Sequence, residues 1–121
     1  MDVRSVSSRS VRACAGPLYR TLPWLPCCVP GAIGIGIGQA AIDELISLAT
    51  EKTPAYTDRP IRSREVAQRN VARGQASLNA ARAYLHQAAD VVYRAAQAGR
   101  KPTLEEGISL QLAACNGLET G

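Results

Sequence analysis

The sequence predicts an all-α protein: an incomplete four-helix bundle of three helices, the middle one long, with an irregular amino-terminal tail over residues 1–30. Two observations lead to this fold class. Apolar residues recur with a helical period over residues 63–98, and the chain is 46% hydrophobic but only 4% aromatic, with no Phe. A core of Ala, Leu, Ile and Val favours close helix packing over a sheet sandwich, and 121 residues are enough for one domain.

The middle helix, expected over residues 63–98, carries the strongest pattern. Large and small residues alternate along its predicted buried stripe: Val71, Leu78, Leu85 and Val92 alternate with Gly74, Ala81, Ala88 and Ala95. Ser63 can cap this helix, Glu65 lies near the positive end of its dipole, and the stretch from Gly99 to Pro102 stops it. Because the small residues let a neighbouring backbone come close, we expect the stripe to face other helices.

Two shorter helices are predicted on either side of the middle one. The first spans residues 31–52 and ends at the proline-containing stretch 53–60. Its expected inward residues are Ile37, Ala41, Ile42, Leu45, Leu48 and Ala49. The third begins at a capping box formed by Thr103 and Glu106. Its expected inward residues are Leu104, Ile108, Leu112 and Cys115.

Glycines crowd the start of the first helix, at positions 31, 34, 36 and 38. A dinucleotide-binding fingerprint would need a glycine in place of Gln39 and a strand before it, and a phosphate-binding loop would need a following lysine. Neither requirement is met. We therefore interpret these glycines as positions where another helix approaches closely.

The run from residue 21 to residue 42 has no charged residue and is long enough to raise the question of a membrane span. Pro23, Pro26 and Pro30 interrupt its first half, and glycines interrupt its second half. We therefore expect no membrane span. Residues 1–16 are rich in Ser and Arg, as mitochondrial transit peptides are, but they lack an amphipathic helix and are interpreted as a tail.

The net charge of +4 comes mainly from arginines in two clusters: Arg4, Arg9, Arg12 and Arg20, and then Arg59, Arg62, Arg64, Arg69 and Arg73. A cluster of this kind can hold a phosphate of a nucleotide or coenzyme, and it can equally be a solvated helix start. The second cluster has no aromatic residues for stacking, and no nucleic-acid-binding motif is present. The prediction is no nucleic-acid binding.

The four cysteines, at positions 14, 27, 28 and 115, lack metal-ligand spacing, and His86 is the only histidine. We therefore expect no metal site. Reduced thiols fit a reducing compartment, and the predicted location is cytoplasmic. His86 has no acidic or thiol partner at a suitable spacing on its helix face, so it is interpreted as a partly exposed structural residue. No catalytic residues can be proposed from these patterns.

Three stretches, in this order, resemble the carboxy-terminal helical domain of the acyl-CoA dehydrogenase superfamily. They are residues 16–20 (GPLYR), residues 34–43 (GIGIGQAAID) and residues 59–85 (RPIRSREVAQRNVARGQASLNAARAYL). The likeness is greatest to the branch that includes two-component flavin-dependent monooxygenases. It implies that residues 31–121 are a truncated acyl-CoA dehydrogenase-like helical domain.

The resemblance also implies a cofactor and an assembly. In this family FAD or FMN is held between the helical domain, a β-domain and a neighbouring subunit of a tetramer. The arginine that reaches a flavin phosphate from the loop before the long helix would be Arg59, and Gln68 matches a glutamine seen early in that helix. The catalytic groups of the family have no counterpart in this chain.

We therefore expect a fragment of a flavin-dependent oxidoreductase that supplies the oligomerisation and flavin-edge domain, binds no flavin alone and is inactive alone. A homo-oligomer is expected. The alternative is a free-standing helical module that binds other proteins through its exposed apolar face.

Overall fold

The computed structural model describes residues 16–21, 24–51 and 65–121, and these residues form helices and no strands. In chain order the elements are α2 (Pro17–Arg20), the 3-10 turn η1 (Leu25–Cys27), α3 (Cys28–Glu51), α4 (Glu65–Gln97) and α5 (Leu104–Thr120). The predicted all-α class is confirmed, with three long helices and α4 the longest.

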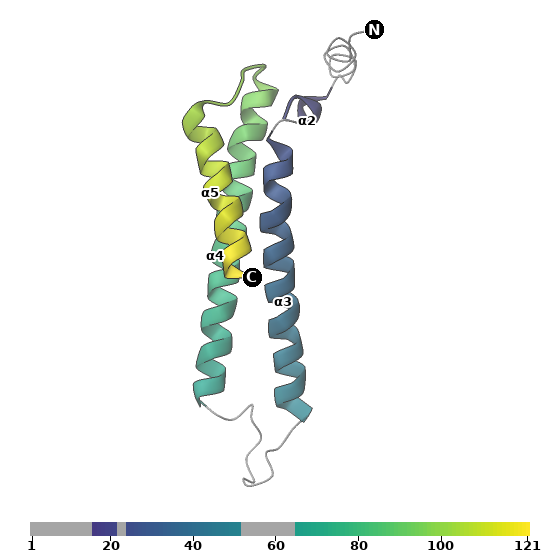
Figure 1. Ribbon diagram of the computed structural model, residues 1–121, viewed down its shortest axis with the longest axis vertical. Helices are drawn as coiled ribbons and strands as arrows, with labels where there is room; N and C mark the ends of the chain where they lie inside the picture. Colours follow the sequence, from purple (N-terminus) through teal and green to yellow (C-terminus); the bar gives the residue numbers. More distant parts are fainter. Residues whose placement is uncertain (1–15, 22–23, 52–64) are drawn as a thin grey trace.

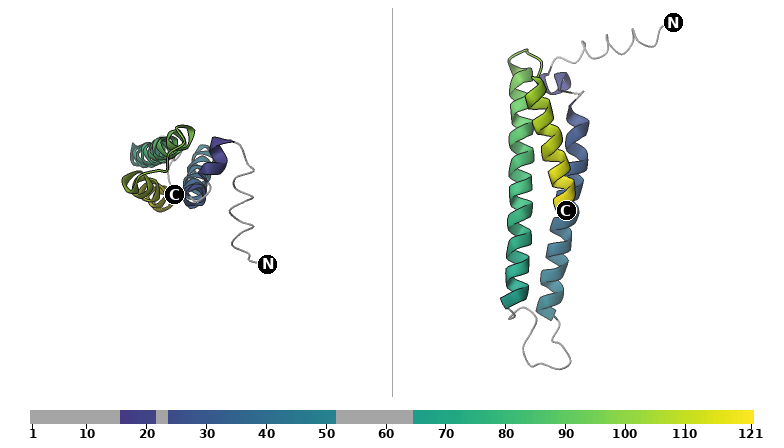
Figure 2. Two further views of the ribbon diagram at one scale, coloured as in Figure 1. Left: turned by 90° about the horizontal axis from the view of Figure 1, so that it is seen from above. Right: turned by 60° about the vertical axis from the view of Figure 1, so that its left-hand side comes forward.

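The three long helices lie side by side as an elongated bundle (Figure 1). α3 and α4 run in opposite directions along its whole length, and α5 packs against one half of both. Figure 2, seen from above, shows the three helices in a triangular arrangement. Beyond the end of α5, no other described helix lies beside the second half of α3 and the first half of α4 (Figure 1).

The predicted stripe of α4 is confirmed. Seven residues of this helix are buried: Leu78, Ala81, Leu85, Ala88, Val92, Ala95 and Ala96. Val71 and Gly74, which belong to the same stripe, are half-buried because they precede the part of α4 that α5 covers. The core is made from this stripe together with Ile35 of α3 and Leu110, Ala113 and Ala114 of α5.

The signals that separate α4 from α5 are confirmed as well. Gly99 adopts a positive φ of 73°, and its N–H donates to the Ala96 carbonyl at 3.1 Å. The N–H of Arg100 donates to the Ala95 carbonyl at 3.1 Å, which closes the end of α4. Thr103 and Glu106 then form the expected capping box of α5.

Glycines bring α3 and α5 into close contact, as the sequence indicated. A Cβ added at Gly34 would lie 2.6 Å from the Gly117 carbonyl oxygen, and one added at Gly31 would lie 2.8 Å from the Ala114 Cα. The two backbones therefore touch along this line. Larger side chains on either helix would force them apart.

The predicted inward face of α3 is wrong. Ile37 is 61% exposed and Leu45 48% exposed, and Ala41 and Leu48 are exposed too, whereas Ile42 and Ala49 are half-buried. The buried residues are Gly31, Gly34, Ile35 and Gly38. The helix turns its glycine face inward because close backbone contact with α5 is possible only there. α3 also begins three residues earlier than expected, with Pro30 in its first turn.

The predicted inward face of α5 is wrong for the same reason. All four expected residues are exposed: Leu104, Ile108, Leu112 and Cys115. The buried face consists of Gly107, Leu110, Ala113, Ala114 and Gly117. Both α3 and α5 thus carry a second apolar face that no other described helix covers.

α3 is long and apolar enough to cross a membrane by length and composition, with a mean hydropathy of 1.4 over its most apolar window and 17% of that window buried. A helix in a bundle and a segment near an amino terminus have the same properties, so this is weak evidence for a span.

Residues 1–15 and 22–23 of the expected tail lie outside the described residues; α2 and η1 are the short turns that lead into α3.

Candidate functional site

The predicted cofactor-binding residue, Arg59, lies outside the described residues, as does the predicted helix cap Ser63. Both belong to the segment between α3 and α4. The end of α3 at Glu51 and the start of α4 at Glu65 lie at the same end of the bundle, the end that α5 does not reach (Figure 1).

The described part of the basic cluster is the first turns of α4. An Arg69 nitrogen lies 3.3 Å from a Glu65 carboxylate oxygen, and both side chains are more than half exposed. Such a pair contributes little to stability because water screens it. Arg73 is exposed one turn further on, and the exposed Gln68 lies between these residues. The described part of this surface can attract a phosphate.

A pair of glutamines that the sequence did not predict connects α3 to α4. The amide of Gln39 donates to the side-chain oxygen of Gln75 at 3.1 Å, and Gln75 donates back to Gln39 at 3.0 Å. Gln39 also donates to Asp43, and Gln75 to Asn79. Gln39, a polar residue among the glycines of α3, was a feature of the sequence that could have indicated this contact. The reciprocal bond joins α3 and α4 at this level of the bundle.

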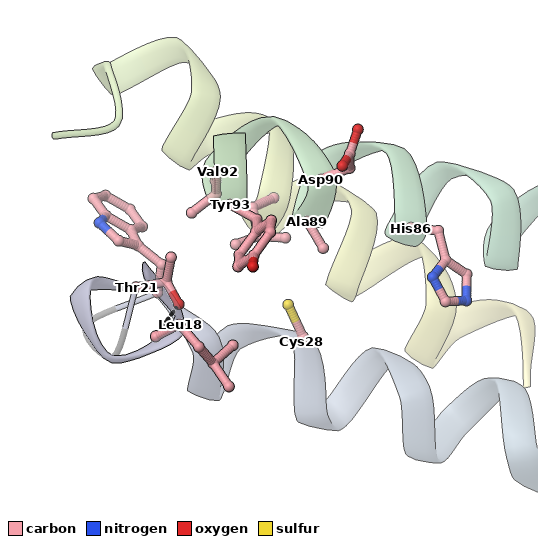
Figure 3. A pocket seen from close by; sticks show the side chains of 10 residues that line it. Leu18, Thr21, Cys28, His86, Ala89, Asp90, Val92 and Tyr93 are labelled. Atoms are coloured by element: carbon pink, nitrogen blue, oxygen red, sulfur yellow. Dashed lines mark hydrogen bonds between the residues drawn. The ribbon is translucent and has the colours of Figure 1, made fainter. Parts of the chain in front are cut away.

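At the opposite end of the bundle, a cavity of about 300 Å³ lies between the lead-in segment and the long helices. Its lining consists of Leu18, Thr21, Trp24, Cys28, His86, Ala89, Asp90, Val92, Tyr93 and Leu110. Figure 3 shows Cys28 and Tyr93 extending into the space from α3 and α4. No local sequence pattern indicated it, because the lining residues come from α2, α3, α4 and α5 and from Thr21 and Trp24 between α2 and η1.

No acid–base pair is assembled from the described residues around this cavity. His86 is exposed, and the Asp90 carboxylate points away from the cavity (Figure 3) and lies 2.8 Å from an Arg94 nitrogen. Burial, and to a smaller extent Cys27, raises the pKa of the Cys28 thiol, which keeps it protonated and weakly nucleophilic. Within the described ranges no three His, Cys, Asp or Glu residues form a group that could hold a metal ion.

The arrangement is that of a helical domain whose described part offers surfaces and a cavity rather than an assembled catalytic centre. Residues 28–118 match the family model described as acyl-CoA dehydrogenase, C-terminal domain. The chain belongs to this family. The match begins at the first residue of α3 and includes nearly all of α5.

A curated relative gives a finer comparison. The chain is 33% identical over 81 residues to an indole-3-acetate monooxygenase of Acinetobacter baumannii. The aligned residues make up 67% of this chain and 21% of the relative. The chain thus spans about a fifth of the length of the protein that it matches.

Proposed function

We propose that this chain supplies the carboxy-terminal helical domain of a flavin-dependent oxidoreductase of the acyl-CoA dehydrogenase type, in its monooxygenase-like branch. The observation that carries the proposal is the family match over residues 28–118. The similarity to a monooxygenase favours that branch over the dehydrogenases. The domain acts as a scaffold and as one edge of a flavin site, and it is inactive alone.

Arg59 is the residue proposed to contact the flavin. It precedes α4 in a stretch with a marked excess of arginine, and a guanidinium binds phosphate through paired hydrogen bonds. One charge-assisted hydrogen bond contributes about 1.5–3 kcal/mol. This is less than the roughly 4–15 kcal/mol that association costs in lost freedom of motion. The chain alone is therefore proposed not to retain FAD or FMN.

A homo-oligomer belongs to the same proposal. The outward faces of α3 and α5 expose large apolar side chains: Val29, Ile33, Ile37, Leu104, Ile108 and Leu112. Apolar surface of this kind on a domain favours association with copies of itself or with other domains. The proposed location is the cytoplasm, with no part for a membrane, a metal or a nucleic acid.

Titration of the purified chain with FAD or FMN, followed by flavin fluorescence, tests the proposal. We expect no saturable binding at micromolar flavin, and no difference between the wild type and Arg59→Ala. The control is Arg69→Ala, which removes an exposed arginine of the same cluster. Micromolar binding that Arg59→Ala abolishes and Arg69→Ala does not would show a complete site in this chain, and the inactive-scaffold proposal would fail.

The second candidate is a free-standing interaction module, which the exposed apolar faces of α3 and α5 favour. The DNA on both sides of the reading frame separates the two. Continuation into further sequence of the same family, in frame or after a frameshift, supports the oxidoreductase domain. Unrelated flanking sequence with a dedicated promoter supports the module.

A further inference from the structure

The cavity at the α2 end of the bundle lies at the opposite end from the start of α4 (Figure 1). We propose that it is a binding site for small, uncharged aromatic molecules of one ring with a short polar substituent. The shape of the cavity, the rigidity of its walls and their chemistry all fit such ligands.

One wall is the lead-in segment, and local hydrogen bonds fix it. Thr21 is buried, and its hydroxyl donates to the Leu18 carbonyl at 2.6 Å. The backbone N–H of Trp24 donates to the Thr21 carbonyl at 2.8 Å, and that of Cys27 donates to the Trp24 carbonyl at 3.1 Å. This chain of turns holds the wall in place before any ligand arrives.

The Trp24 ring is fixed from the other side by α5. It lies directly over Gly107, where an added Cβ would overlap the ring. Gly107 is buried, and Trp24 is partly buried against the core. The ring therefore has no room to shift toward α5. A preformed space with rigid aromatic walls is the usual form of a small-molecule site.

The lining selects for uncharged aromatic ligands. Leu18, Val92 and Leu110 supply aliphatic surface, while Trp24 and Tyr93 supply rings for edge or face contacts. The described lining contains no Lys or Arg that could neutralise an anion. Asp90 is already paired with Arg94, and the Cys28 thiol stays protonated, so a ligand cation has no unpaired carboxylate to meet there.

Two polar groups can orient a ligand. Figure 3 shows the Tyr93 hydroxyl directed toward the side of the cavity where the Cys28 sulfur lies. A phenolic hydroxyl donates and accepts hydrogen bonds, and a thiol donates weakly. A ligand hydroxyl placed between them would be satisfied while its ring contacts the apolar walls. About 300 Å³ lies at the lower end of the range for ligand sites and suits one ring rather than several.

Trp24 is the only tryptophan of the chain, so its fluorescence reports on the cavity directly. The probe is 2-phenylethanol, and phenylacetate is its anionic counterpart of similar shape. Excitation at the long-wavelength edge of tryptophan absorption avoids absorption by the benzene ring of the ligand. We expect a saturable change in emission, half-complete at roughly millimolar 2-phenylethanol, as suits about nine non-hydrogen atoms. Phenylacetate should bind at least about tenfold more weakly, because its carboxylate would lose its hydration on binding without gaining a cationic side chain as partner.

A filled cavity provides the decisive variant. Ala89 lines the cavity, and Ala89→Phe should abolish the response to 2-phenylethanol. Ala83→Phe is the matched control, because Ala83 is exposed on the same helix and should leave the response intact. No saturable response in the wild type, an equal response to phenylacetate, or an unchanged response in Ala89→Phe would each overturn the proposal.

A second measurement is independent of the folding of these variants. Alkylation of Cys28 in the wild type by an uncharged maleimide, followed by peptide mass spectrometry, reports access to the cavity. We expect 2-phenylethanol to slow alkylation of Cys28 several-fold and to leave the exposed Cys115 unaffected. Equal rates at Cys28 with and without 2-phenylethanol would contradict the site.

Discussion

At the scale of single residues, burial separates leucines that look alike in the sequence. Leu78 is 2% exposed in the stripe of α4, whereas Leu112 is 57% exposed on the outward face of α5. Leu78→Ala should lower the free energy of unfolding by about 2–5 kcal/mol, because it leaves a cavity in the core. Leu112→Ala should change it by no more than about 0.5 kcal/mol. Urea unfolding of both variants measures the difference, and equal losses would place Leu112 in a core.

The ion pair between Arg100 and Glu106 predicts a dependence of stability on pH. The carboxylate of Glu106 accepts hydrogen bonds from two Arg100 nitrogens at 2.8 and 2.6 Å and from the Thr103 N–H at 2.8 Å. The bonds from Arg100, followed by that from Thr103, lower the pKa of Glu106 from 4.5 to about 2. A lowered carboxyl pKa stabilises the fold above the unfolded value, and this contribution is lost as pH falls from about 4.5 toward about 2.

Melting temperatures measured across this pH range test the ion pair. As the pH falls, the melting temperature of the wild type should drop further than that of Glu106→Gln, which can still cap α5 but carries no charge. Glu105→Gln, one residue earlier, removes an exposed carboxylate that forms no ion pair with the described residues and should keep the wild-type dependence. Parallel curves for the wild type and Glu106→Gln would show that the pair contributes nothing to stability.

At the scale of helices, the contact between α3 and α5 depends on glycine. Gly34→Ala should lower the free energy of unfolding by about 1–3 kcal/mol, because the new Cβ meets the backbone of Gly117 and Leu118 at 2.6 Å. Gly36→Ala is the matched control, since nothing lies within 4 Å of its added Cβ. It should raise stability by roughly 0.5–1 kcal/mol through helix propensity. Chemical unfolding of the two variants should give changes of opposite sign, and equal signs would contradict the close approach.

The sequence predicted some helices better than others. α4 was predicted almost completely because its polar face is continuous, so only one stripe can be buried. α3 and α5 are apolar on two sides. The prediction followed the large apolar residues and therefore assigned the wrong side of each helix to the core. Ile37 and Ile108 are outward because Gly34 and Gly117 allow a backbone contact that larger residues prevent. Periodicity describes how apolar a face is, whereas the closeness of packing decides which face is buried.

The candidate sites were less predictable than the helices. The cavity combines residues of α2 and the three long helices with Thr21 and Trp24, and no local pattern joins Leu18 to Tyr93 or Leu110. The pairing of Gln39 with Gln75 depends on the register between α3 and α4, which only the folded chain defines. Arg59 was indicated by family resemblance and lies outside the described residues, so its role stays a proposal.

At the scale of the whole molecule, the uncovered faces of α3 and α5 predict self-association. The apparent mass from light scattering should rise with protein concentration, because association removes apolar surface from water. Ile37→Glu places a charge on a residue that is 61% exposed and should lower the apparent mass. Ala76→Glu, at an exposed position of α4, is the control and should have no effect. A single monomer mass over a wide concentration range would contradict the prediction.

We propose that this chain is the helical domain of a flavin-dependent enzyme, and a domain exchange with the relative is the sharpest test. The matched segment of the Acinetobacter baumannii indole-3-acetate monooxygenase is replaced by the aligned 81 residues of this chain, and flavin affinity is measured by fluorescence titration. We expect the chimera to bind flavin, and we expect Arg59→Ala to weaken binding about tenfold or more, as loss of a charge-assisted contact should. Arg69→Ala should not weaken it. A folded chimera that binds no flavin, or that binds it equally with and without Arg59, would contradict the account.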